Sequence, residues 1–183
     1  SPLTRFATVA VLWLAFLGGG EALAARHASP PLVGAARLLA ALGAGAVLFQ
    51  AAQSLQVPAY EPRLVGLWSA GTLLHGYLTR SHMPFFVGLV TGVVWWFWQP
   101  LWDGADGLTV VVLLGAGAVL AASLAVLHDG RIDSFAWAWR TVGDGMALLA
   151  LFAAAIPDIG ADGIVWTTWL VVALVLAGLA LLA

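Results

Sequence analysis

The sequence contains no cysteine and no lysine, and charged residues of every kind are scarce. Because cysteine is absent, disulfides, thiol chemistry and thiolate metal sites are excluded. The seven basic residues are all arginines that stand singly along the chain, and the formal net charge is −2. Such a chain has no basic patch for a phosphate backbone, so we expect no nucleic-acid partner.

The chain is instead rich in apolar residues. Of the 183 residues, 62% are hydrophobic and 9% are charged, and the mean hydropathy is +1.00, whereas a soluble domain has about 25% charged residues. Proline, glycine and charged residues divide the chain into seven apolar segments, each close to the roughly 20 residues that cross a bilayer. We predict an all-α fold, a polytopic integral membrane helix bundle with about seven transmembrane helices and lipid as its first partner. The segments are residues 5–26, 32–55, 62–79, 83–101, 107–128, 134–156 and 164–183.

The connections between the segments are short and rich in turn residues, so we expect residues 1–183 to form a single transmembrane domain. Arginine placement sets the orientation, because basic residues are retained on the cytoplasmic side. We therefore predict that the odd-numbered loops are cytoplasmic and that the protein lies in the inner membrane of the cell. This orientation puts residue 1 outside, which leads us to expect a preceding helix in a longer chain. The odd-numbered loops are residues 26–31, 80–82 and 128–133, with Arg26, Arg80 and Arg131.

Two features at the ends of the segments bear on this layout. The first segment resembles a secretory signal peptide, because Arg5 precedes an apolar stretch and Ala22 to Ala24 resemble a cleavage site. The segment is long for a signal peptide, however, and Glu21 lies directly before the cleavage site. We therefore prefer a transmembrane helix. The tryptophans fit an aromatic belt at the membrane interfaces. The tryptophans expected at the outer interface are Trp95, Trp96, Trp98, Trp102, Trp166 and Trp169. Trp137 and Trp139 are expected toward the opposite membrane interface.

The stretch LGAGAVL occurs twice, at residues 42–48 and 114–120. A dinucleotide fingerprint is excluded, because leucine replaces its third glycine and no strand precedes it. Two explanations remain, an inverted duplication of three helices or independent selection of small residues for helix packing. The register favours packing, since Trp68 would align with Arg140. The pair Gly88 and Gly92 in the fourth segment also indicates close helix packing.

The first hundred or so residues follow, in order, a Ser-Pro-x-x-Arg entry to a helix, a helix of the GAxxxGAGxxLxxQ kind and a helix of the LxxLWAxxxLxxxYLLRS kind. In these motifs the chain resembles a family of predicted bacterial membrane proteins, domain of unknown function 2157. A Gln-Ile-Tyr of the family is replaced here by Gln53, Ser54 and Leu55. The resemblance implies a membrane protein with a helix before residue 1, and it supplies no activity. The matching residues are Ser1, Pro2, Arg5, Gly43, Gly45, Gln50, Leu67, Trp68, Leu78, Arg80 and Ser81.

Five ionisable residues fall inside the predicted helices: Glu21, Arg37, His75, Arg140 and Asp144. Buried charge in a bilayer is costly and marks candidate functional sites. The first four are expected near one depth at the cytoplasmic side. Asp144 is expected near the membrane centre, one turn beyond Arg140 on the same face, so the two can pair within their helix. Two interpretations of these five residues remain. They form a polar vestibule that moves protons and binds an anion or a lipid headgroup, or their opposite charges neutralise one another and stabilise the helix bundle.

On the outer side, Gln50 and Gln53 lie one turn apart and are expected to hydrogen-bond a neighbouring helix, or else to form part of a surface for a partner. The histidines outside the helix interiors stand singly, so we assign no metal and no cofactor. Neither G-x-S-x-G nor H-E-x-x-H occurs, and a hydrolase has no visible nucleophile.

Three classes of function follow from these residues. The preferred one is a non-enzymatic structural or accessory membrane subunit that binds other membrane proteins. The alternative is a small secondary transporter or permease-like module that works through Asp144, Arg140 and Glu21, and it predicts a hydrated cavity at Asp144. A membrane enzyme comes third, because no paired carboxylates or similar constellation is evident. The sequence does not determine a homo-oligomeric state.

Overall fold

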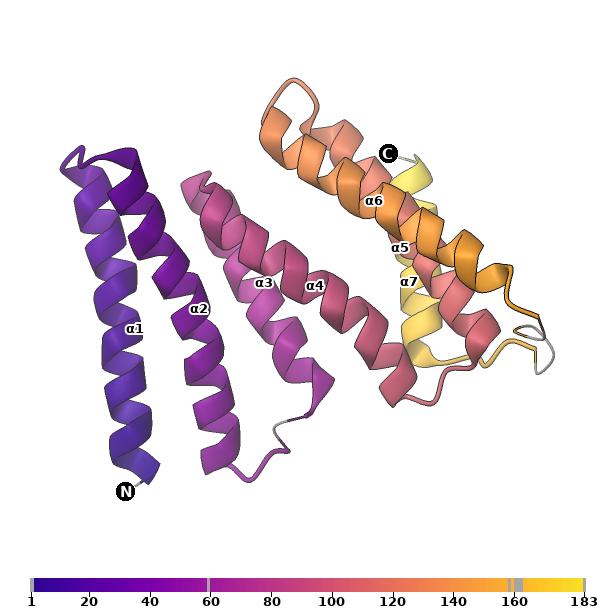
Figure 1. Ribbon diagram of the computed structural model, residues 1–183, viewed down its shortest axis with the longest axis horizontal. Helices are drawn as coiled ribbons and strands as arrows, with labels where there is room; N and C mark the ends of the chain where they lie inside the picture. Colours follow the sequence, from indigo (N-terminus) through magenta and orange to yellow (C-terminus); the bar gives the residue numbers. More distant parts are fainter. Residues whose placement is uncertain (1, 59, 158, 160–162, 183) are drawn as a thin grey trace. The chain divides into compact units, whose positions relative to one another are not determined.

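The computed structural model describes residues 2–58, 60–157, 159 and 163–182, and all regular structure in these ranges is α-helical (Figure 1). One helix lies on each of the seven apolar segments, which confirms the all-α prediction. The helices are α1 (Pro2–Ala25), α2 (Pro30–Ser54), α3 (Pro62–Thr79), α4 (His82–Trp102), α5 (Gly107–His128), α6 (Asp133–Ala154) and α7 (Thr168–Leu182).

Local chemistry sets the ends of these helices. Prolines open α2 and α3, where the missing N–H removes no helical hydrogen bond. Asp106 caps α5, because its Oδ1 accepts the backbone N–H of Thr109 at 2.7 Å. Two hydrogen bonds from Thr109 hold the pKa of the Asp106 carboxyl below its ordinary value. The one from the Thr109 side chain has the larger effect and the one from its backbone N–H the smaller. The cap is therefore ionised at neutral pH.

The last helix begins later than we predicted. Residues 164–167 are not helical, because the buried Thr109 hydroxyl accepts the N–H of Val165 at 2.9 Å and donates to its carbonyl at 3.3 Å. Helix α7 then starts where the Thr167 hydroxyl accepts the N–H of Leu170. The segment before α7 is thus fixed against the start of α5.

Four helices among the described residues are long and apolar enough to cross a membrane: α1 over Thr4–Ala25, α2, α4 and α5. Seven transmembrane helices are not confirmed. Helix α6 contains the charged residues Arg140 and Asp144, and α7 is a shorter apolar helix. Helix α3 contains Ser69, Thr72 and His75.

The chain divides into two compact units, Ser1–Trp95 and Trp96–Ala183. In the first unit, α1 packs beside α2 and α2 beside α3. In the second unit, α5 packs against both α6 and α7 (Figure 1). The core of the second unit is Trp96, Leu113, Ala116, Met146, Leu170, Ala173 and Ala177.

The predicted close packing at Gly88 and Gly92 is confirmed. A Cβ on Gly88 would lie 2.6 Å from the backbone N of Leu73, and one on Gly92 would lie 2.7 Å from the Ser69 hydroxyl. That hydroxyl donates to the carbonyl of Gly88 at 2.7 Å. The two glycines thus bring α4 against α3 closely enough for a side chain to bond the facing backbone.

Both copies of LGAGAVL receive a tryptophan ring in the same way. The Trp68 Nε1–H donates to the carbonyl of Ala41 at 2.8 Å, and a Cβ on Gly45 would lie 2.6 Å from the same ring. In the second unit, Trp96 Nε1–H donates to the carbonyl of Leu113 at 3.0 Å, and a Cβ on Gly117 would lie 2.8 Å from that nitrogen. We call each pair, a carbonyl and the glycine four residues later, a tryptophan socket.

The two tryptophan sockets differ in which helix supplies the ring. Trp68 comes from α3, which follows the LGAGAVL helix, whereas Trp96 comes from α4, which precedes it. A duplication would keep the order of the helices, so this reversal favours independent selection of small residues. Trp96 itself is buried in the core of the second unit, where Gly117 leaves room for its ring.

The tryptophan sockets predict which glycines tolerate a methyl group. Gly45→Ala and Gly117→Ala should each lower the free energy of unfolding by about 1–3 kcal/mol, because the new Cβ overlaps an indole ring. Gly115→Ala is the matched control from the same motif, since nothing lies within 4 Å of its Cβ position. Thermal unfolding of the purified protein in detergent, followed by tryptophan fluorescence, measures the difference. Equal losses for Gly115→Ala and Gly117→Ala would contradict the assignment.

Candidate functional site

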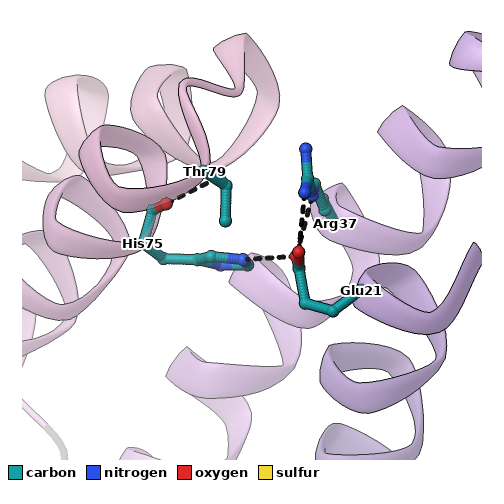
Figure 2. Close-up of polar contacts among 4 residues, drawn as sticks. All are labelled: Glu21, Arg37, His75 and Thr79. Carbon is teal, nitrogen blue, oxygen red and sulfur yellow. Dashed lines mark hydrogen bonds and ion pairs between the residues drawn. The ribbon is translucent and has the colours of Figure 1, made fainter. Parts of the chain in front are cut away.

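Three of the predicted ionisable residues meet in the first unit. Glu21 lies near the end of α1, Arg37 lies two turns into α2, and His75 lies one turn before the end of α3. Figure 2 draws the Glu21 carboxylate between the Arg37 guanidinium and the His75 ring. We call these three residues the Glu21 cluster.

The strongest contact in the Glu21 cluster is a bidentate ion pair. Arg37 Nε donates to Glu21 Oε1 at 2.8 Å, and Arg37 Nη2 donates to Glu21 Oε2 at 2.7 Å. The guanidinium side chain is 14% exposed and the carboxylate side chain 43%. The planar fork of arginine matches a carboxylate in this way and uses both oxygens. Each charge therefore has a fixed partner in the adjoining helix.

Packing beside the ion pair brings α1 and α2 together. Gly20 is buried, and a Cβ there would lie 3.4 Å from the Cβ of Ala36. The neighbouring residues Glu21 and Arg37 consequently lie where the two helices approach each other. The ion pair then joins two helices that the sequence places in antiparallel succession.

His75 completes the Glu21 cluster without a firm hydrogen bond. Its Nε2 lies 3.5 Å from Glu21 Oε1, and its side chain is 15% exposed. The nitrogen is buried and has no hydrogen-bond partner of normal geometry among the described residues. Thr79, one turn later, donates its hydroxyl to the His75 carbonyl at 2.7 Å (Figure 2). A protonated His75 would add a second cation beside the carboxylate.

Arg140 and Asp144 belong to the second unit and do not pair with each other. Arg140 Nη2 instead donates to a carboxylate oxygen of Asp129, in the turn between α5 and α6. The sequence offered a signal for this partner, because a short helical turn brings residues just before it close to the first turns of the next helix. Spacing within α6 alone predicted Asp144 as the partner of Arg140.

Asp144 is exposed on α6 and has no hydrogen bond or ion pair with any described residue. It lies midway along the helix, about 15 Å from either end. Next to it, a Cβ on Gly143 would lie 3.3 Å from the carbonyl of Ala118, which is in the middle of the apolar helix α5. An unpaired carboxylate at the centre of a bilayer costs roughly 2.5–3.5 kcal/mol on insertion scales.

The outer-side glutamines lie at the end of α2. Gln50 is partly exposed and Gln53 is exposed. Within the part of the chain that the structure describes, neither side-chain amide has a hydrogen-bond partner, so the expected bond to a neighbouring helix is not formed there. Among the described residues no group of three or more His, Asp or Glu side chains is placed to hold a metal ion.

Comparison with known proteins agrees with the membrane character of the first unit. Residues 1–85 match the family model described as predicted membrane protein, domain of unknown function 2157 (DUF2157). This part of the chain is similar to predicted membrane proteins. The match confirms the resemblance and contains the whole Glu21 cluster, while Arg140 and Asp144 lie beyond it. No curated protein and no solved structure matches the chain.

The Glu21 cluster predicts strong coupling between two residues. In a double-mutant cycle of Glu21→Gln and Arg37→Gln, we expect a coupling energy of about 1–3 kcal/mol, because each change leaves the other charge without its partner. The control is Glu61 and Arg63, a 3.6 Å pair whose arginine side chain is 77% exposed, for which we expect less than about 1 kcal/mol. Unfolding in detergent measures both cycles. Equal coupling in the two pairs would contradict a structural role for the Glu21 cluster.

Proposed function

We propose that this protein is a non-enzymatic membrane subunit that acts by associating with other membrane proteins. The observation that carries the proposal is the outward position of Asp144, an exposed carboxylate midway along α6. A transporter uses intramembrane carboxylates that face a cavity or the interior of a bundle. A polar side chain on the outer surface of a helix is instead suited to bind another helix in the membrane.

The environment of Asp144 supports association with a membrane protein. The large side chains of the following turns, Leu148, Leu151 and Phe152, are all exposed. An exposed apolar surface that follows a polar group on the same helix face suits a partner helix within lipid. The pocket in the second unit lends a transport pathway no support, because its lining lacks a charged residue: Trp96, Phe97, Pro100, Val110, Leu113 and Leu114.

The alternative is a small secondary transporter or permease-like module. Glu21 favours it, because its half-exposed carboxylate lies beside a histidine and proton carriers use such groups. Against it stands the bidentate bond to Arg37, which would have to break in each cycle.

Two measurements on the same protein separate these functions. A photo-crosslinking amino acid at Leu148, beside Asp144, should give a discrete adduct in native membranes. Leu12, which is exposed on α1, is the control position. Proton flux into liposomes that contain the purified protein should be unchanged by Asp144→Asn and by Glu21→Gln. Flux that is lost in Asp144→Asn, with no adduct from position 148, would refute the subunit and support the transporter.

A further inference from the structure

The surface around Asp144 is arranged to admit a second helix closely. Thr141 and Leu148 lie one turn to either side of Asp144, and all three are exposed. Nothing lies within 4 Å of the Cβ position of Gly145, so the backbone of another helix has room to approach there. We call these four residues, Thr141, Asp144, Gly145 and Leu148, the Asp144 face.

Among the described residues of the second unit, no cation contacts Asp144. Arg140 is one turn away, but it is bound to Asp129. Arg131 lies in the turn before α6, about 20 Å along the helix from Asp144. His128, at the end of α5, is held by its ring nitrogen against the carbonyl of Leu124 at 2.6 Å. The carboxylate therefore faces outward with its charge uncompensated by the unit that carries it.

The depth of Asp144 restricts what can compensate that charge. Gly143 packs against Ala118, Ala121 and Ala122 of α5, and α5 is one of the helices apolar enough to span the membrane. Asp144 is therefore level with the middle of a helix that is apolar enough to span the membrane. Lipid tails offer no hydrogen-bond donor at that level, and headgroup cations lie at the interfaces.

We propose that the Asp144 face is the docking surface for a transmembrane helix of another protein that carries one arginine or lysine at the depth of Asp144. This inference rests on the proposed function and adds the chemistry of the partner. Charge complementarity is its basis, since an intramembrane carboxylate pairs with an opposite charge. A second copy of this chain fits the charge less well, because a symmetric parallel pair would bring two Asp144 carboxylates together at one depth.

The test uses synthetic transmembrane peptides as partners of known chemistry. The purified protein carries a fluorescence donor in lipid vesicles, and acceptor-labelled leucine-rich peptides carry a central lysine, leucine or aspartate. We expect the lysine peptide to associate at least tenfold more tightly than the leucine peptide. Asp144→Asn, which preserves the shape of the side chain, should abolish the difference between the two peptides.

Two further variants test whether Arg140 competes for Asp144. Asp129→Asn frees Arg140 to turn toward Asp144, one turn along the same helix, and should weaken lysine-peptide association severalfold. Arg140→Gln removes the competing cation and should preserve that association. Unfolding in detergent verifies that each variant is folded.

Every other outcome overturns the proposal. Equal association of the leucine and lysine peptides would refute the charged partner, as would preference for the aspartate peptide or a photo-adduct of twice the mass of the chain. If position 148 still yields a heterologous adduct in native membranes while the lysine peptide fails, the subunit function stands and only the partner's chemistry is wrong. If both fail, both proposals fall.

Discussion

Inside a bilayer no water is present to hydrogen-bond polar groups, so these groups must bond one another within the protein. Most of the helix packing in this protein follows from that constraint. The indole N–H of Trp68 bonds a carbonyl of α2, and that of Trp96 bonds a carbonyl of α5. The Ser69 hydroxyl bonds the backbone of α4. A glycine lies at each of these contacts, because a donor reaches a backbone carbonyl only where no side chain intervenes. Both copies of LGAGAVL thus pack against a tryptophan ring in the same way.

Charged groups also lack water inside a bilayer, and the two units differ in how their charged side chains are paired. Glu21 and Arg37 satisfy each other through both oxygens of the carboxylate, so these two charges of the first unit neutralise each other. In the second unit Arg140 bonds Asp129 near the end of a hairpin, and Asp144 remains exposed midway along α6. The first arrangement joins two helices of one unit, whereas the second leaves the carboxylate of Asp144 exposed and without a partner among the described residues. This contrast is why we propose that the protein works by association.

The sequence predicted the helices well, because segment length, proline and glycine are local signals. It missed the late start of α7, which depends on Thr109 contacting a residue 56 positions away. Glu21, Arg37 and His75 were identified by their rarity in apolar helices, but the bidentate bond required the approach of α1 and α2. Spacing along one helix favoured Asp144 as the partner of Arg140, whereas the observed partner, Asp129, lies in the short turn before α6. Nothing in LGAGAVL distinguished Gly117, which faces a ring, from Gly115, which faces none.

The most direct test measures the surroundings of the Asp144 face while Asp144 itself stays in place. Because the chain has no cysteine, Thr141→Cys and Leu148→Cys each accept a single nitroxide label. In vesicles of purified protein, we expect both labels to collide more often with oxygen, which dissolves in lipid, than with a water-soluble nickel chelate. Greater access for the nickel chelate at both positions would place Asp144 in water and contradict a docking surface within the membrane.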